Sequence, residues 1–269
     1  YENLSIGLTI LAIGLFKKVI IADNIAAFST PIFNSSAAGH ELSFFEAWCG
    51  ALAYTFQLYF DFSGYSDMAI GLSRMFGVRL PINFNSPYKA KNIIDFWRRW
   101  HITLSTWLRD YLYIPLGGNR NGKYLTYINL FITFLLGGLW HGAGWTFVVW
   151  GGMHGAALGI HRAWQLMGFR MHALLGWFIT FMFINMAWVF FRAESFEGAT
   201  RILKGMLGMN GVQVSEQFAY TFNYLTSWPF YQLQGSRANS LIPIDALEYI
   251  IIFGLAAFLL PNSIQMNLS

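Results

Sequence analysis

The chain has 269 residues, of which 55% are hydrophobic, 19% aromatic and only 11% charged. A soluble domain carries about 25% charged residues, so this composition excludes an ordinary soluble globular domain, a disordered chain and a disulfide scaffold. The 26 glycines and the abundant aromatic residues suit helices packed in lipid instead. The single cysteine, Cys49, excludes an intrachain disulfide and a multi-cysteine metal site. The net charge of +4 is too small to indicate a nucleic-acid partner.

A helix that spans a membrane needs a run of about 20 mostly apolar residues, and the chain has several such runs. The first run, from Leu4 to Phe28, is interrupted by Lys17 and Lys18, which predicts either one span with snorkelling lysines or two short helices. We expect five or six spans in an all-α polytopic membrane protein. Because the chain opens Tyr-Glu-Asn without an initiator Met, we expect it to be the C-terminal part of a longer membrane protein. The further candidate spans are Phe44–Phe60, Tyr124–Trp140, Trp145–Ile160, Leu174–Phe191 and Ile244–Leu260, the last closed by Pro261.

The segment from Arg74 to Lys123 is strongly basic. It holds nine of the 17 basic residues but only Asp95 and Asp110 as acids. Positively charged loops stay on the cytoplasmic side, so we expect this segment to face the cytoplasm. Its first part, Pro81 to Pro87, has turn chemistry.

From Asn92 to Leu112 the apolar residues recur at helical spacing. This pattern predicts one amphipathic helix that is too polar to span the membrane and lies in its interface or along a wet cavity. The apolar stripe consists of Ile93, Trp97, Trp100, Leu104, Trp107 and Tyr111.

Histidines are the first candidates for chemistry. His141 ends an apolar span within a glycine-rich run, and an ionisable residue at membrane depth is a functional candidate by default. An equally weighted alternative is a histidine hydrogen-bonded between helices that the glycines allow to pack closely. His101 borders the apolar stripe and, taken alone, favours a structural or headgroup contact. His154 and His161 lie about 10 Å apart along one predicted helix, too far for one metal ion, so we expect no metal site.

Charged pairs are the second group of candidates. Asp61 and Asp67 could bind a cation, orient a histidine or pair with Arg74, and pairing is the favoured interpretation. Arg98 and Arg99 could receive the phosphates of a soluble donor or those of anionic lipid headgroups. Neither a serine-hydrolase elbow nor a nucleotide-binding glycine loop occurs in the sequence.

Three long runs carry a more specific pattern. They are Tyr59-Phe-Asp-Phe-Ser-Gly-Tyr-Ser-Asp67, Phe96-Trp-Arg-Arg-Trp-His101 with Leu104-Ser-Thr-Trp-Leu-Arg-Asp-Tyr111, and Leu139-Trp-His-Gly142. Together they resemble the membrane-bound O-acyltransferase family. The run Tyr113-Ile-Pro-Leu-Gly-Gly-Asn-Arg120 is similar to its alginate O-acetyltransferase branch. The teichoic-acid D-alanyl transferase branch shares the run Trp97-Arg-Arg-Trp-His101 but departs after it.

The resemblance covers roughly residues 10 to 165, and the tail from about 170 to 269 matches only in being hydrophobic. It implies one membrane-embedded region, residues 1–269, forming the C-terminal part of a ring of transmembrane helices around a tunnel, with an amphipathic or re-entrant helix at 92–112. It also implies that His141 is the catalytic residue and His101 a supporting one.

The activity implied is O-acyl transfer to hydroxyl groups. In this branch acetyl is supplied to an exported polysaccharide such as alginate, or to a cell-wall polymer, in the bacterial inner membrane and with a periplasmic partner of the serine-esterase type. We expect acetyl-CoA as the donor, its phosphates held by Arg98 and Arg99, with no permanently bound cofactor.

Two other classes compete with an enzyme. Interrupted helices, carboxylates such as Asp61 and Asp67, and glycine-rich half-spans also occur in transporters and channels, which perform no acyl transfer. A structural membrane subunit is the third class. The long motif match ranks the enzyme first.

Overall fold

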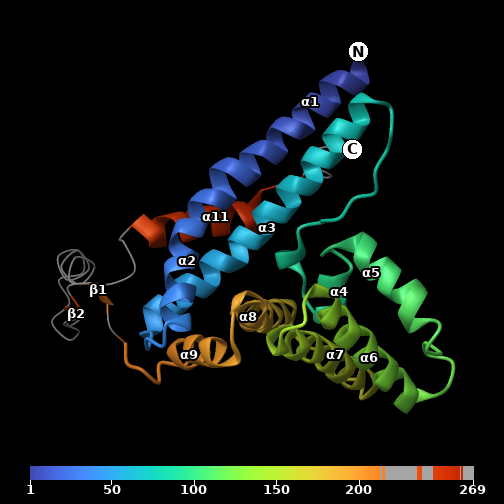
Figure 1. The fold of residues 1–269 in the computed structure, drawn as a ribbon. Coiled ribbons are helices and arrows are strands. Elements are labelled where there is room, and N and C mark those ends of the chain that lie inside the picture. Colours follow the sequence, from blue (N-terminus) through green and yellow to red (C-terminus); the bar gives the residue numbers. More distant parts are fainter. Residues whose placement is uncertain (213, 216–234, 238–244, 261, 263–269) are drawn as a thin grey trace.

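The computed structural model describes residues 1–212, 214–215, 235–237, 245–260 and 262. Its N-terminal part is a long helical hairpin. One arm runs without a break through α1 (Glu2–Leu15), the π-helical segment η1 (Phe16–Ala22) and α2 (Asp23–Ala37), and the other arm is α3 (Phe44–Met75). Figure 1 shows the two arms lying side by side over most of their length. Of the two alternatives for the first apolar run, the structure therefore has the continuous helix.

Small residues bring the two arms of the hairpin into backbone contact. A Cβ on Gly14 would lie 2.7 Å from the carbonyl oxygen of Gly64, and one on Gly71 would lie 2.6 Å from the carbonyl oxygen of Gly7. Such close approach is how helices associate where lipid supplies no hydrophobic driving force between them. A capping box of Ser43 and Glu46 begins α3 and fixes where the second arm starts.

Helices α4 to α8 form a second group beside the hairpin, whereas α9 and α11 pack against the hairpin itself (Figure 1). Within this second group α6 packs along α7, while α8 contacts both α3 and α7. A two-stranded pair, β1 with β2, is the exception to helical structure in the described residues. The elements are η2 (Pro87–Lys89), α4 (Ile93–Trp97), α5 (Ile102–Leu108), η3 (Arg109–Tyr113), α6 (Lys123–His141), α7 (Trp145–Leu166), α8 (Ala173–Arg192), α9 (Phe196–Met206), β1 (Val214–Ser215), β2 (Gly235–Arg237) and α11 (Asp245–Leu259).

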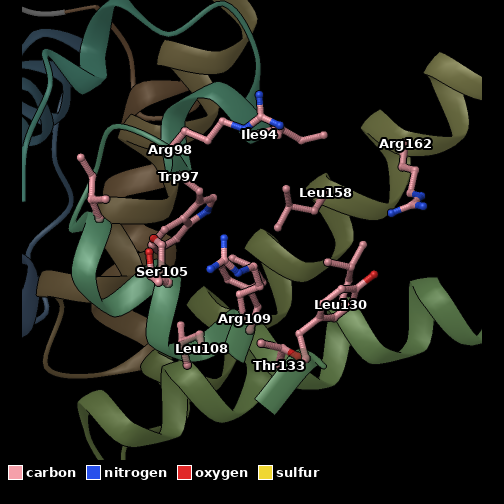
Figure 2. A pocket seen from close by; sticks show the side chains of 14 residues that line it. Ile94, Trp97, Arg98, Ser105, Leu108, Arg109, Leu130, Thr133, Leu158 and Arg162 are labelled. Carbon is pink, nitrogen blue, oxygen red and sulfur yellow. The ribbon is translucent and has the colours of Figure 1, made fainter. Parts of the chain in front are cut away.

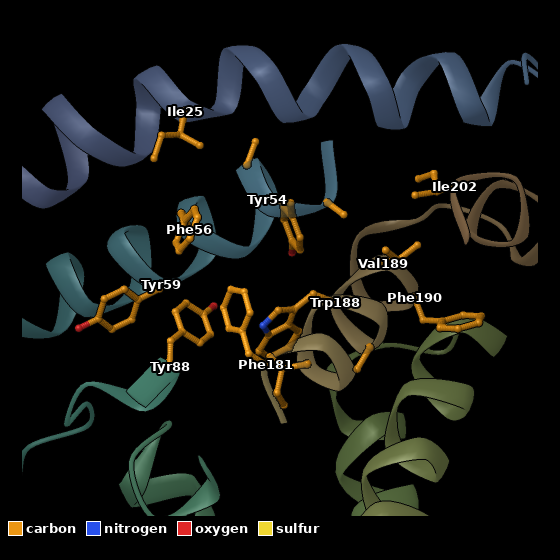
Figure 3. Packing of buried hydrophobic residues seen from close by; sticks show 14 of the residues in the cluster. Ile25, Tyr54, Phe56, Tyr59, Tyr88, Phe181, Trp188, Val189, Phe190 and Ile202 are labelled. Atoms are coloured by element: carbon orange, nitrogen blue, oxygen red, sulfur yellow. The ribbon is translucent and has the colours of Figure 1, made fainter. Parts of the chain in front are cut away.

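The core between α3 and α8 is largely aromatic (Figure 3). Tyr88, from η2, reaches into it, and its hydroxyl donates to the carbonyl oxygen of Thr55 at 2.6 Å. Trp188 of α8 is 1% exposed and packs against Trp100 with ring centroids 5.0 Å apart. These contacts fix the basic segment against the apolar helices.

The predicted all-α class is confirmed for most of the described chain, whereas the ring of helices around a tunnel stays a prediction. Two helices in the described residues have the length and apolarity of a membrane span, Glu2–Ala37 and Ala173–Arg192. The other expected spans overlap helices α3, α6, α7 and α11, although α3 continues past the expected end at Phe60 to Met75. The count of five or six spans stays a prediction. Ile244 and Pro261, which bound the last expected span, lie outside the described residues.

The prediction of one amphipathic helix from Asn92 to Leu112 is wrong in its middle. The structure has the short helix α4, a turn, and then α5, which continues into the short π-helix η3. The apolar stripe is consequently split. Trp97 and Trp100 are buried, but Trp107 and Tyr111 are 48% and 66% exposed. The helix is interrupted because the backbone amides of Ile102 and Thr103 donate to Asn83, in the loop before α4, instead of to carbonyl groups one turn earlier in a continuous helix.

Candidate active site

His101 stands at this break, immediately before α5. Its φ of +41° is a left-handed conformation that residues other than glycine seldom adopt. Asn83, in the loop that precedes α4, stabilises this backbone conformation by accepting hydrogen bonds from the two residues after His101. The backbone carbonyl of Asn83 accepts from the Ile102 amide at 3.0 Å, and its side-chain oxygen accepts from the Thr103 hydroxyl at 2.6 Å. A strained conformation persists where surrounding contacts over-determine it, and such positions gather at functional sites.

The His101 imidazole is uncharged at neutral pH. It packs edge-on against Phe62 of α3, with ring centroids 4.7 Å apart. Burial, and secondarily the charge that His141 would carry, lower the pKa of His101 to about 4. The structure therefore brings the two histidines predicted from the sequence within electrostatic range of each other.

His141 is the last residue of α6 and is held by aromatic rings. Its ring centroid lies 4.9 Å from that of Trp140, 5.3 Å from that of Trp150 and 5.1 Å from that of Phe191. The side chain is half-buried, and none of the described residues hydrogen-bonds to it. The neighbouring rings thus fix the position of the imidazole, while its nitrogens have no hydrogen-bonding partner among the described residues. A histidine hydrogen-bonded between packed helices, the alternative from the sequence, finds no partner in the described part of the chain.

The glycines near His141 serve close helix packing. A Cβ on Gly138 would overlap the carbonyl oxygen of Phe147, and one on Gly151 would overlap that of Phe134. Helices α6 and α7 can approach this closely only with glycine at both positions. Of the roles that the sequence allowed for the glycines near His141, close helix packing is therefore the role of Gly138.

Another histidine, His154 of α7, is fully buried and ties α7 to α4. The indole N–H of Trp97 donates to its Nδ1 at 3.2 Å. Trp150 lies between His141 and His154, with its ring centroid 4.8 Å from that of His154. Sequence reasoning considered His154 only as a metal ligand. No three His, Cys, Asp or Glu side chains of the described residues gather in a metal-binding arrangement.

The structure separates the two adjacent arginines. The Nε of Arg99 donates to Asp95 at 2.8 Å, and another of its nitrogens donates to the carbonyl oxygen of Asn85 at 3.3 Å. Arg98 is exposed, and its guanidinium makes no hydrogen bond or ion pair with the described residues.

Arg98 lines a pocket of about 510 Å³ between α4, α5 and η3 on one side and α6 and α7 on the other. Figure 2 shows Arg98, Arg109 and Arg162 on different walls of this pocket. Neither His101 nor His141 is among its lining residues. Sequence reasoning missed Arg162 because nothing in the local pattern of α7 predicts that it faces a segment 60 residues earlier. It missed Asn83 because a turn signal does not say what the turn will cap.

The favoured pairing of the carboxylates is confirmed, but Arg74 as the partner is wrong. Asp67 pairs with Lys17 at 2.6 Å, and Asp61 pairs with Lys18 at 2.6 Å. The continuous first arm places both lysines beside α3, so neither lysine has to snorkel out of the apolar run.

Residues 1–197 match the profile of MBOAT, the membrane-bound O-acyltransferase family. The chain belongs to this family. The resemblance seen in its motifs is thus confirmed, and both His101 and His141 fall inside the matched part.

Relatives of this chain differ in the substrate that their names give. The chain is 59% identical over 218 residues to the peptidoglycan O-acetyltransferase of Helicobacter pylori, covering 80% of this chain and 41% of that protein. It is 53% identical over 206 residues to a probable alginate O-acetylase of Pseudomonas aeruginosa, covering 76% and 38%. Identity to the teichoic acid D-alanyltransferase of Bacillus subtilis is 32% over 158 residues, covering 53% and 40%. The chain therefore spans about two-fifths of the length of these relatives.

Proposed function

We propose that the protein to which this chain belongs transfers acetyl from a cytoplasmic thioester, acetyl-CoA, toward the hydroxyl groups of an exported polysaccharide or cell-wall polymer. The family and the names of its O-acetylating relatives support the reaction class. The observation that carries the assignment to residues is the placement of His141, ring-packed and without a hydrogen-bonding partner in the described residues, within electrostatic range of a neutral His101.

In this proposal His141 is the general base. A hydroxyl is a weak nucleophile near neutral pH, so its proton must be removed as its oxygen attacks the thioester carbonyl carbon. An imidazole nitrogen of His141 accepts that proton. As the tetrahedral intermediate collapses, the carbon–sulfur bond breaks, and the protonated imidazole returns the proton to the leaving thiolate. No net proton is gained or lost by the protein.

His101 stabilises the oxyanion of that intermediate. Because its pKa is about 4, it is neutral at physiological pH and is too weak a base to compete with His141 for the hydroxyl proton. A neutral imidazole still has one N–H to donate, and preorganised donors at a developing oxyanion contribute strongly to catalysis. The left-handed backbone at His101 supplies the preorganisation.

The donor enters from the cytoplasm over the basic segment, with Arg98 and Arg99 attracting its phosphates. Arg98 is already free to do so, whereas Arg99 would have to share its guanidinium with Asp95. We place the protein in the bacterial inner membrane as a multi-pass protein. There it passes acetyl to a periplasmic partner of the serine-esterase type.

The test is transfer from radiolabelled acetyl-CoA in membranes that hold the full-length protein and its neighbours. We expect His141→Ala to lower transfer by about 10²-fold or more, the scale of general acid–base catalysis. His101→Asn should cost less, because the amide can still donate to the oxyanion. The double variant should be scarcely worse than His141→Ala, since groups that act as one unit are strongly non-additive.

The matched control is His40→Ala, which removes an exposed histidine that is remote in sequence from both motifs. Wild-type transfer by well-folded His141→Ala would remove the general-base role. The competing class, a transporter or channel, predicts movement of an intact solute with no label transferred.

A further inference from the structure

The pocket beside α4 concentrates positive charge. Among the described residues, its lining includes three guanidinium groups from three different segments and no carboxylate. Arg98 follows the end of α4, Arg109 begins η3, and Arg162 lies on α7 in the opposite wall (Figure 2). Three like charges around one cavity repel one another unless an anion occupies it.

The three arginines are available to an anion to different degrees. The guanidinium groups of Arg98 and Arg162 make no hydrogen bond or ion pair with the described residues. Arg109 donates to the neighbouring Asp110 at 2.7 and 3.1 Å, and each partner shifts the pKa of the other toward the charged form. Both side chains are exposed, 61% and 40%, and an ion pair in water contributes little stability. A more highly charged ligand can therefore recruit Arg109 from Asp110.

The rest of the pocket selects the kind of anion. Its remaining walls are apolar with scattered hydroxyl groups, which suits a chain of low charge that carries a phosphate. Planar guanidinium groups bind phosphate oxygens with two parallel hydrogen bonds. The apolar and hydroxyl-bearing lining residues are Ile94, Trp97, Ile102, Ser105, Thr106, Leu108, Tyr113, Leu130, Thr133, Phe134 and Leu158.

We propose that this pocket is a phosphate-binding site for an amphiphilic molecule, with Arg98, Arg109 and Arg162 as its ligands. Two sources have this chemistry: the phosphorylated pantetheine chain of a thioester donor and the headgroup of an anionic phospholipid. Only the first source rests on the proposed function. Since neither His101 nor His141 lines the pocket, a donor anchored there reaches His141 only with an extended chain beyond its phosphate.

Direct binding tests the site without requiring turnover. Purified full-length protein is titrated with desulfo-CoA, which has no thiol to acylate, and separately with phosphatidylglycerol or phosphatidylcholine vesicles. We expect Arg98→Gln and Arg162→Gln each to weaken binding of the matching phosphate ligand about tenfold, since each removes a charge-assisted hydrogen bond. Arg162→Lys should retain part of the affinity. Asp110→Asn should strengthen binding, because it frees Arg109.

The control is Arg120→Gln, which removes an exposed arginine outside the pocket. Thermal unfolding identifies variants that fail to fold, and Arg162→Lys keeps the test informative if Arg162→Gln is one of them. The phosphate site is supported if binding of desulfo-CoA, or of phosphatidylglycerol but not phosphatidylcholine vesicles, depends on these arginines. The ligand whose binding depends on them identifies the source of the phosphate. Binding of both ligands by Arg98→Gln and Arg162→Gln at the level of Arg120→Gln overturns it.

The proposed function can fail separately. Arginine-dependent desulfo-CoA binding by a wild-type protein that transfers no label would retain the site and remove the reaction. Normal transfer with unchanged donor KM in both arginine variants would retain the reaction and remove the thioester donor as the source of the phosphate.

Discussion

His101 and His141 owe their positions to different kinds of contact. Hydrogen bonds accepted by the backbone and side-chain oxygens of Asn83 hold the turn at His101, whereas aromatic rings hold the imidazole of His141. This difference decides which substitutions are informative. Asparagine tolerates the left-handed region better than most residues, so His101→Asn removes the imidazole without forcing the turn to rearrange. At His141, alanine removes ring contacts but leaves the backbone at the end of a helix.

The lowered pKa of His101 predicts a pH-dependent stability. The folded-state pKa is about 4, and an unperturbed histidine titrates near 6.5. Between these values the unfolded chain binds the proton and the folded chain does not. The contribution of the neutral His101 to the free energy of unfolding is therefore fully present above pH 6.5 and decreases as the pH falls toward 4.

The measurement is the thermal midpoint of detergent-solubilised protein at several pH values from 7.5 to about 4. We expect the midpoint of His101→Asn to fall less steeply over this window than that of the wild type. Other titrating groups are common to both proteins and cancel in the comparison. Parallel curves would show that His101 is protonated equally in the folded and unfolded states.

Among the elements, the turn between α4 and α5 depends on the loop before it. The side-chain oxygen of Asn83 caps α5 by accepting from the Thr103 hydroxyl at 2.6 Å and from its amide at 3.3 Å. We expect Asn83→Ala to destabilise the protein by about 1 kcal/mol, the usual loss for a helix cap. Transfer should fall further than abundance, because the turn is then free to straighten and His101 moves with it.

This expectation is checked by comparing specific transfer activity with denaturant midpoint. Asn119→Ala, in an exposed loop, is the control for replacing an asparagine. A variant of Asn83 that is destabilised yet fully active per folded molecule would show that the loop does not position His101.

The pairing of α6 with α7 sets a second prediction at this scale. A Cβ at Gly138 would overlap the Phe147 carbonyl oxygen, whereas one at Gly137 would meet the Leu108 side chain at 3.5 Å, an ordinary contact. Gly138→Ala should therefore destabilise the protein by about 1–3 kcal/mol, as overpacking does. Gly137→Ala should be tolerated. Equal thermal midpoints for the two variants would contradict the close approach of these helices.

Across the whole molecule, charge is placed inside an apolar hairpin. Lys17 and Asp67 pair there with side chains 13% and 7% exposed, while Lys18 and Asp61 form a neighbouring pair at 40% and 43%. Removing one partner of a buried pair leaves an uncompensated charge, so Asp67→Asn should cost about 3–5 kcal/mol. Asp61→Asn, at the exposed pair, should cost less than about 1 kcal/mol.

Restoring neutrality should restore stability. The double change Lys17→Met with Asp67→Leu replaces the pair by apolar groups, an exchange that is often neutral or stabilising. Chemical unfolding in detergent distinguishes these cases. If Asp67→Asn unfolds no more readily than Asp61→Asn, the pair at Lys17 is hydrated rather than buried.

The sequence by itself determined the composition class, the helical character and the family. Long apolar runs with few charges can satisfy their backbone hydrogen bonds in lipid only as helices, so the positions of α1, α3, α6, α7 and α8 followed from hydropathy. The motif runs around His101 and His141 identified membrane-bound O-acyltransferases because such long runs are specific, as the match over residues 1–197 confirms.

Only the tertiary structure decided what the polar residues contact. Helical periodicity between Asn92 and Leu112 describes side-chain spacing, but it cannot show that Asn83 offers the backbone better hydrogen bonds than a continuous helix would. Likewise, proximity in the sequence paired Asp67 with Arg74, whereas η1 brings Lys17 to it from 50 residues away. Contacts between distant segments depend on how helices pack, and no local pattern encodes that. The three-arginine pocket exists for the same reason.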